Sequence, residues 1–481
     1  MPAYYLEIAT VALGLVLLML EAFLEKVDKR TIGWIALVGL LGIFLAATVF
    51  VQEAPDAANC GFYCADKLAL FYKKLSLVAA IIVIIMGMEF TPVLSRYLAG
   101  EGKQGGIGEF FCLPVFVTAG LMLMASANDL LAIFVALELV TISFYILVAY
   151  MRRNVGSLEA GVKYLILGAL STGFFVYGVA WIFGVTGQTD LAKIGEVLHQ
   201  LPEGTKLATF FAFALLLVGL GFKIAAVPFQ IWVPDVYQGA PTPVTAFLSV
   251  GSKAAGFIVL IRVLQPFLGA EATAEQVRSI LLVVAGATII YGNFAAIAQT
   301  NSSGCSPTPA FRTSASPPRS RQRRAEELHL LGRRWFSTSA TYLLMTLAAF
   351  LVLTAIRVHL GGDELSNSTG FAKRSPFAFA MVVSSVSLAG VPTAGSSASS
   401  SSSPPPPTTG ISARCSSSLP LVLPPVSITT SRSSALMFSG TTQNPETPVL
   451  ISGVARNALG VLVAGILILG VYPKPILAML P

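Results

Sequence analysis

The chain has 481 residues, of which 55% are hydrophobic and only 11% are charged, and its mean hydropathy is +0.76. A soluble protein carries roughly a quarter charged residues, so this composition excludes an ordinary soluble enzyme. The net charge of +7 does not indicate a nucleic-acid partner, because 302–335 holds seven Arg and two Glu and alone contributes +5.

Apolar runs of about twenty residues recur along the chain, and a helix needs about this length to cross a bilayer. Because backbone groups in the bilayer core must pair within each helix, the runs predict an all-α, polytopic membrane protein. No small-residue cleavage site follows the first run, so we expect a retained helix rather than a signal peptide. The twelve expected spans are 3–24, 32–51, 69–90, 110–126, 128–150, 161–185, 207–231, 242–265, 278–299, 341–360, 376–395 and 449–479.

Basic residues gather in alternate loops. The loops after the first, third and fifth spans carry Lys26, Lys29, Arg30, Arg96, Lys103, Arg152 and Arg153. The loop 52–67 carries acids and only Lys67 at its edge. The positive-inside rule therefore predicts an N-terminus on the outer, periplasmic side of the membrane.

The cysteines and histidines form no pattern that holds a metal ion or an iron–sulfur cluster, and no nucleotide-binding fingerprint is present. We therefore expect no redox chemistry in this chain. Cys60 and Cys64 share an outward loop, where a disulfide can form. From the sequence, a disulfide between Cys60 and Cys64 and two unpaired thiols are both possible interpretations.

Two stretches, 302–335 and 396–438, break the apolar pattern. The first is rich in Ser, Pro and Arg, and the second contains a serine and proline run at 399–407. The ordinary interpretation is two disordered loops. We favour the hypothesis that both are out-of-frame translations. A one-base shift of the codons permits Phe-Lys-Arg-Leu-Leu-Ala-Tyr-Ser-Ser-Ile-Ser-His over 302–313, Gly-Phe-aliphatic-Gly-Lys-Phe over 395–400 and Tyr-Tyr-Tyr over 428–430, all typical of helices.

Lys223 is the most informative charged residue, because it lies inside the apolar run 207–231. A lysine at mid-membrane depth is costly unless it is paired or hydrated, so its default interpretation is functional. Pro228 follows five residues later and removes a helix hydrogen bond at about the same depth. A buried cation beside a broken helix predicts an ion pathway.

Other charged residues also lie inside predicted spans. Glu138 is in mid-span, where a carboxylate is protonated, paired with a cation, or used for a hydrogen bond between helices. Lys253 has small neighbours that let another helix or water approach closely. Lys163 follows Glu159 at the spacing of a helix ion pair, although a snorkelling interfacial lysine is the alternative. Arg262 lies nearer a helix end, which suits an interfacial position.

Acids and amines on neighbouring helices can relay protons. Burial favours the neutral amine of a lysine, whereas an approaching carboxylate favours the ammonium, so moving the partner charge loads or unloads the lysine. We expect Glu138, Lys163, Lys223 and Lys253 to form such a pathway. A membrane scaffold without transport is the alternative, and it predicts that Glu138, Lys223 and Lys253 tolerate apolar replacement. The connection 232–243 contains three prolines and is expected to be rigid and not continuously helical.

The motif from Gly221-Phe222-Lys223 through Pro228-Phe229 to Trp232 and 234–241 resembles the antiporter-like membrane subunits of respiratory complex I, the proton-translocating NADH-quinone oxidoreductase. The Mrp-type cation/proton antiporters are close relatives of that family. Three features favour the subunit N branch of this family. Residues 157–164 are similar to its sixth helix, and the permitted Tyr-Tyr-Tyr resembles its thirteenth. The terminal helix with 471–473 is not followed by the long lateral helix that subunit L has. The resemblance covers 1–301, 340–395 and 439–481.

The resemblance implies fourteen helices with two inverted repeats, each containing a broken helix, of which twelve spans survive here. It divides the chain into N-terminal helices at 1–109, a first repeat at 110–265, a second repeat at 266–438 and a C-terminal helix at 439–481.

By position, Glu138 resembles the family's helix-5 carboxylate, Lys163 a helix-6 lysine and Lys223 the central helix-7 lysine. Lys253 resembles the helix-8 lysine that links toward the second half. The family's helix-12 lysine and a histidine fall at Ser399 and Thr313, so the second half lacks them as written.

The implied function is proton translocation in a bacterial inner membrane, coupled to redox chemistry in other subunits. NADH, FMN, iron–sulfur clusters and quinone are then expected in partner subunits, and a neighbouring antiporter-like subunit and small helical subunits are the expected partners. A subunit of a Mrp-type antiporter is the alternative.

Overall fold

The computed structural model describes residues 1–23, 29–51, 61–98, 106–200, 202–298, 321–360 and 451–471. Within them, ten helices are long and apolar enough to cross a membrane, which confirms the all-α polytopic fold. In these residues, β-type pairing is limited to two isolated bridges, Tyr63 with Ala127 and Asp129 with Asp190. In chain order the elements are α1 (Tyr4–Phe23), α2 (Arg30–Val49), α3 (Lys67–Leu98), α4 (Ile107–Ser126), α5 (Leu130–Val148), α6 (Val155–Thr186), α7 (Leu191–His199), η2 (Glu203–Thr205), α8 (Lys206–Ile224), α9 (Trp232–Gly239), α10 (Thr242–Phe247), η3 (Leu248–Ser252), α11 (Lys253–Gly269), α12 (Glu271–Ala298), α13 (Arg321–Leu360) and α18 (Gly453–Val471).

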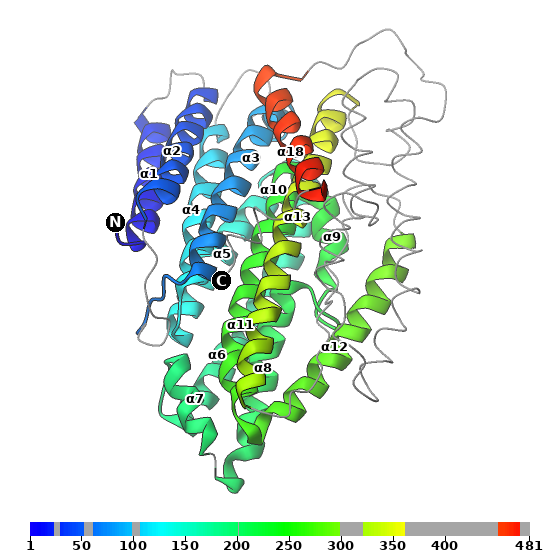
Figure 1. Ribbon diagram of the computed structural model, residues 1–481. Coiled ribbons are helices and arrows are strands. Elements are labelled where there is room, and N and C mark those ends of the chain that lie inside the picture. Colours follow the sequence, from blue (N-terminus) through cyan, green and yellow to red (C-terminus); the bar gives the residue numbers. More distant parts are fainter. Residues whose placement is uncertain are drawn as a thin grey trace.

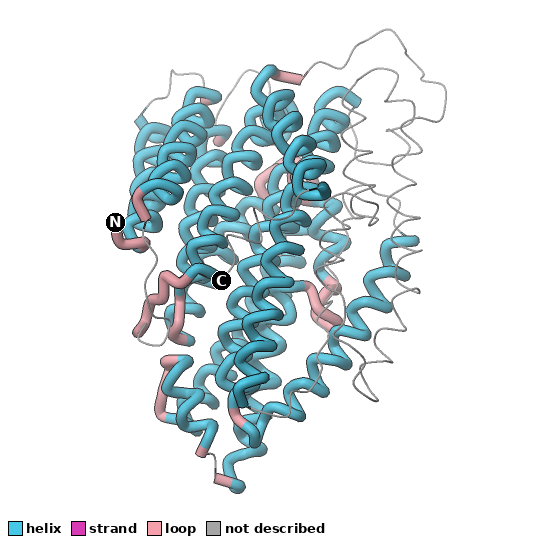
Figure 2. The backbone as a smooth tube through the Cα atoms, viewed as in Figure 1, coloured by secondary structure: helices cyan, strands magenta, loops and turns pink. Residues whose placement is uncertain are grey.

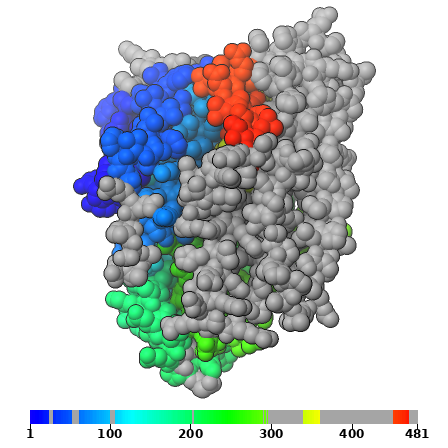
Figure 3. Space-filling model, in the orientation of Figure 1, coloured from blue at the N-terminus to red at the C-terminus, as the bar shows by residue number. Residues whose placement is uncertain are grey.

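Most of the long helices lie side by side (Figures 1 and 2), and short described turns join α4 to α5 and α5 to α6. The continuous span formed by α10, η3 and α11 is 94% buried, and the span in α13 is 89% buried, so these helices form the centre. By contrast, α1, α2, α6 and α12 are only 28–33% buried. Figure 3 shows α1 and α2 (blue) at one edge, with α18 (red) at the surface beside them. Such exposed apolar faces suit contact with lipid or with another membrane helix.

Polar residues at three turns fix where helices begin. The Asp129 carboxylate accepts hydrogen bonds from two backbone N–H groups of the first turn of α5. Asn154 does the same for α6, and Asp190 for α7. Each cap satisfies N–H groups that have no partner within the helix, which stabilises a helix start by about 1 kcal/mol.

The loop before α3 is tied to the turn between α4 and α5. The Cys64 N–H donates to the Ser126 carbonyl at 2.7 Å, and the Asn128 N–H donates to the Phe62 carbonyl at 3.1 Å. Cys64 is disulfide-bonded, while Cys60 lies outside the described residues. These contacts place 61–66 at the same end of the bundle as the α4–α5 turn.

Most predicted spans correspond to described helices, but the span predicted over 207–231 ends early. The helix α8 stops at Ile224, because Ala225 adopts a left-handed conformation with φ 58°. Pro228 explains why no helix resumes at once, since it has no N–H to donate. The predicted span 376–395 lies outside the described residues.

The prediction that 232–243 is not continuously helical is confirmed, because α9 ends at Gly239 and α10 begins only at Thr242, although both sides of this break are helical. Pro234 lies in the first turn of α9, and Pro243 lies in the first turn of α10. A proline is tolerated there because a first-turn N–H has no partner within its helix. The chain turns only between these two short helices.

The prediction of a break across 302–335 needs correction, because α13 begins at Arg321. Residues 321–335 contain no Ser or Pro and are rich in Arg, Glu and Leu, which favour helix. The span long and apolar enough to cross a membrane still starts only at Ser339. Residues 302–320 and all of 396–438 lie outside the described residues, so the frame-shift hypothesis stays a prediction.

Candidate functional site

Lys223 lies in the last turn of α8, where the helix breaks in the middle of the bundle. The residue is only 4% exposed. Gly221 is required at this turn, because a Cβ there would come within 2.6 Å of the Phe229 ring. The chain after the break therefore packs against the end of α8, and this packing keeps Lys223 inside the protein.

Aromatic residues of the sequence motif hold this break in place. Trp232 Nε1 donates at 3.1 Å to the Phe222 carbonyl, an oxygen in the last turn of α8 that also accepts from the Ala225 N–H. The Trp232 ring also packs on Phe222 and on Tyr164 of α6, with centroid distances of 5.2 and 5.0 Å. The motif thus builds the backbone shape that positions Lys223.

The Lys223 ammonium faces α5, where Nζ donates to Oγ1 of Thr141. Glu138 precedes Thr141 by one helical turn and lies close enough to act electrostatically on Lys223. Among the described residues the two charges form no direct ion pair. Instead, Glu138 Oε1 accepts a hydrogen bond of 2.9 Å from Thr172 of α6. The carboxylate is thus held near the lysine but not on it.

Lys253 begins α11, directly after the π-helical turn η3. It is 1% exposed, and its Nζ has no hydrogen-bond partner in the part of the chain that the structure describes. Its charge lies 5.1 Å from the centre of the Tyr237 ring, within the range of a cation–π contact. Gly256, one turn later, lies close against α8, because a Cβ there would be only 3.2 Å from Cβ of Lys223. The expected close approach of another helix is confirmed, since α8 packs against α11 at this point.

Lys163 is placed apart from the other three. Its Nζ forms ion pairs of 2.7 Å with Glu159 and with Asp235 of α9, and its side chain is 42% exposed. The structure therefore brings Glu138, Lys223 and Lys253 together and leaves Lys163 at the surface of α6. The expected Glu159 pair is confirmed, whereas Asp235 as a second partner was not predicted.

Several polar residues of the membrane helices were not singled out from the sequence. Thr141 and Thr172 carry no charge and give no signal in a hydropathy pattern. Glu7 and Lys73 are charged and lie inside predicted spans, so the argument used for Lys223 applied to them equally. Arg262 was expected at the interface but is 4% exposed and paired with Asp66.

The arrangement suits proton transfer rather than ligand binding. Two buried amines and one partly buried carboxylate lie on three packed helices around the broken end of α8. An amine in such a place changes charge when the nearby carboxylate or a water molecule moves. Each of the three groups can hold or release one proton, and their use as a pathway stays a prediction.

Comparison with protein families agrees with this geometry. Residues 127–303 match the family model described as NADH:quinone oxidoreductase/Mrp antiporter, TM. That range includes Glu138, Lys163, Lys223 and Lys253.

Curated proteins and solved structures extend the similarity over the chain. NADH-quinone oxidoreductase subunit N of Heliobacterium modesticaldum is 38% identical over 399 residues, covering 80% of this chain and 78% of that protein. The protein of the same name from Desulforamulus reducens is 32% identical over 472 residues, covering 98% and 95%. A chain of respiratory complex I from Thermus thermophilus, solved with bound aureothin, superposes with a TM-score of 0.71 at 25% identity and covers 98% of both chains.

Proposed function

The chain belongs to the NADH-quinone oxidoreductase subunit N family, and from this premise we propose that it carries protons across a bacterial inner membrane as part of that complex. NADH oxidation and quinone reduction, with their FMN and iron–sulfur cofactors, are assigned to partner subunits. The partners are other membrane subunits, which can pack on exposed apolar helices such as α6. The names of the relatives support this function over that of a Mrp-type antiporter.

The buried lysine at the end of α8 carries the proposal. A charge at 4% exposure inside a membrane bundle is costly, and a purely structural residue there would be apolar. Among the described residues its one hydrogen bond is donated to a neutral threonine, which stabilises the ammonium less than a carboxylate in direct contact would. Lys223 is therefore held where small electrostatic changes decide whether it keeps its proton.

In the proposed mechanism, Lys223 is the switchable carrier. Glu138 favours its charged form when near and releases it when drawn toward Thr172 or a partner subunit. Lys253, which has no hydrogen bond in the described part of the chain, accepts the proton next through water between α8 and α11. Lys163, held by two carboxylates at the surface, is assigned the role of an electrostatic link to the break through Asp235.

The test is Lys223→Met in the complete complex. We expect the NADH:quinone reductase to assemble while the number of protons moved per NADH falls, because methionine fills the lysine volume but holds no proton. Lys193→Met is the matched control, since Lys193 is exposed on the short helix α7. A normally assembled Lys223→Met complex with an unchanged proton-to-NADH ratio rules out the carrier role.

A further inference from the structure

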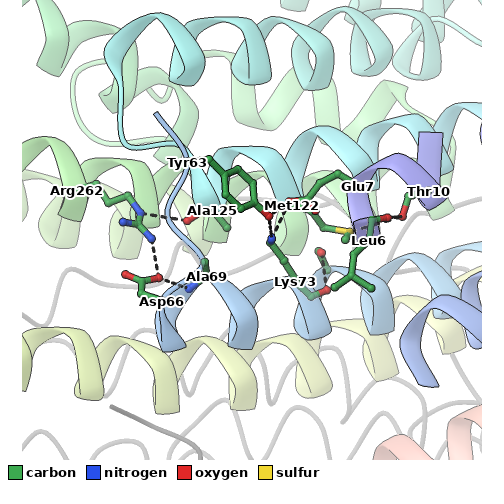
Figure 4. Close-up of polar contacts among 11 residues, drawn as sticks. Leu6, Glu7, Thr10, Tyr63, Asp66, Ala69, Lys73, Met122, Ala125 and Arg262 are labelled. Atoms are coloured by element: carbon green, nitrogen blue, oxygen red, sulfur yellow. Dashed lines mark hydrogen bonds and ion pairs between the residues drawn. The ribbon is translucent and has the colours of Figure 1, made fainter. Parts of the chain in front are cut away.

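A second group of buried titratable residues lies outside the site described above (Figure 4). Lys73 of α3 forms an ion pair of 2.7 Å with Glu7 of α1 and donates to the Tyr63 hydroxyl at 2.5 Å. Tyr63 in turn donates to the same oxygen of Glu7 at 3.0 Å. The Lys73 side chain is 0% exposed and that of Glu7 is 11% exposed. We call Glu7, Lys73 and Tyr63 the α1–α3 triad.

The triad lies at one end of the bundle. Glu7 is in the first turn of α1, Lys73 is in the second turn of α3, and Tyr63 is in the loop before α3. This loop is hydrogen-bonded to the α4–α5 turn, on the side that the charge pattern assigns to the outside. Tyr63 is partly exposed, so the triad reaches from the protein interior to water.

Packing alone does not explain these charges. Replacing a buried ion pair with apolar residues of similar volume is often neutral or stabilising, so a buried pair is weak evidence of a structural role. One carboxylate oxygen, Glu7 Oε2, is buried without a hydrogen-bond partner among the described residues. An oxygen in that state is free to take up a proton or a water molecule. Burial and the Glu7 carboxylate raise the pKa of Tyr63, so its hydroxyl stays protonated and donates.

A second ion pair beside the triad offers a contrast. Arg262 of α11 forms a pair of 2.8 Å with Asp66 and donates to the Ala125 carbonyl, and both charges act electrostatically on Lys73. An arginine does not release its proton in a protein, whereas a buried lysine does. The Arg262 pair can therefore hold α11 against α3, and only the triad can transfer a proton.

One contact connects the triad to the proton carriers in the centre. The Tyr72 hydroxyl, next to Lys73 in sequence, donates at 2.5 Å to the Gly251 carbonyl in η3. Lys253 follows that turn directly and has no hydrogen-bond partner in the described part of the chain. A π-helical turn widens the helix at this point and is common at functional sites. The α3 helix therefore meets η3, the turn that directly precedes Lys253.

From these contacts we propose that the α1–α3 triad is a proton exit for the first half of the subunit, supplied by Lys253. The inference rests on the proposed function. The ion pair of Lys73 and Glu7 is the loaded state, which forms when the Lys253 ammonium gives its proton through water to the neutral amine of Lys73. The Lys73 ammonium passes one proton to the Glu7 carboxylate, and the resulting carboxyl group releases it to water at the loop of Tyr63. Each step moves one proton, and the triad returns to its starting charge.

The deciding variant is Lys73→Arg in the complete complex, because arginine keeps the ion pair with Glu7 but does not release a proton. We expect normal NADH:quinone reductase activity and the same loss of protons per NADH that Lys223→Met produces. The neutral double variant Glu7→Gln/Lys73→Met should show the same loss, and it provides the readout if arginine does not fit the closed site. An unchanged ratio in whichever of the two assembles overturns the proposal.

The matched control is Asp66→Asn/Arg262→Met, which removes the neighbouring ion pair. Asparagine can still cap α3 through the Ala69 N–H, so the helix start is kept. We expect this variant to retain the proton-to-NADH ratio. If the ratio falls as far as in Lys73→Arg, breaking any ion pair at this place is enough to lower it, and the relay is contradicted. Lys223→Met separates the two proposals: if it lowers the ratio and Lys73→Arg does not, only the exit is wrong.

Discussion

The hydrogen bond from Lys223 to Thr141 should control how readily this lysine holds a proton. The Thr141 hydroxyl accepts from Lys223 Nζ and donates its own hydrogen to the Leu137 carbonyl. The Thr141 hydroxyl thus acts both as an acceptor and as a donor. Because Thr141 is 0% exposed, bulk water cannot replace it as the acceptor for Lys223. Thr141→Val keeps the volume and shape of the side chain but removes the acceptor.

The size of the effect follows from the charge and the burial. A hydrogen bond to a charged group contributes roughly 1.5–3 kcal/mol, and losing it acts on the ammonium form alone. Because each 1.4 kcal/mol is a tenfold change in an equilibrium, the protonated fraction of Lys223 should fall roughly 10- to 100-fold wherever neutral lysine is already the main form. In Thr141→Val the Leu137 carbonyl loses the threonine hydroxyl but still accepts a backbone N–H of the helix, so the fold should change little.

The assay is proton uptake into membrane vesicles, measured beside NADH:quinone reductase activity. We expect slower uptake in Thr141→Val at nearly normal reductase activity, and wild-type behaviour in Thr141→Ser, which keeps the hydroxyl. Thr118→Val is the matched control, because the Thr118 hydroxyl is buried in α4 and donates only to the Pro114 carbonyl of its own helix. If Thr141→Val pumps like the wild type, or if Thr118→Val is equally impaired, the reasoning about Lys223 is refuted.

Further predictions concern packing, orientation and the two unusual stretches. Gly239→Ala should lower the thermal midpoint of the complex at a cost of about 1–3 kcal/mol, because its Cβ would lie 2.4 Å from the Gly156 carbonyl oxygen; Gly173→Ala, with nothing within 4 Å, should not. In intact cells, an impermeant thiol reagent should label Lys193→Cys but not Arg152→Cys, and the opposite pattern would reverse the orientation. Resequencing of the coding DNA across codons 295–340 and 390–445 should reveal a one-base slip at each edge of both stretches, and an uninterrupted frame would sink that hypothesis.

The broken helix shows how much of the site the sequence pattern could predict. Lys223 inside an apolar run and Pro228 after it were enough to predict a buried cation beside a helix break. The position of the break was missed, because it depends on the left-handed Ala225 and on Phe229 packing against Gly221. A backbone conformation of that kind is decided by the contacts that hold it and not by the residue type.

The ion-pair partners of the charged residues show what the sequence pattern could not predict. Lys163 and Glu159 are four residues apart on one helix, so their ion pair was predictable from spacing alone. Arg262 and Asp66 are 196 residues apart, and nothing in their local sequence relates them. Lys73 and Glu7 meet only because α1 and α3 both pack against α4.

The sequence by itself determined that this is a helical membrane protein, where its first spans lie and that Glu138, Lys223 and Lys253 are charged residues inside apolar spans. These properties follow from the transfer of each segment from water to lipid, which depends on local composition. The tertiary structure alone decided that Lys223 donates to Thr141 while Glu138 is held by Thr172, that Lys253 of α11 has no hydrogen-bond partner in the described part of the chain, and that Glu7, Lys73 and Tyr63 meet toward one end of the bundle. Those relations depend on how each helix is rotated and packed, and rotation is set by contacts between distant parts of the chain.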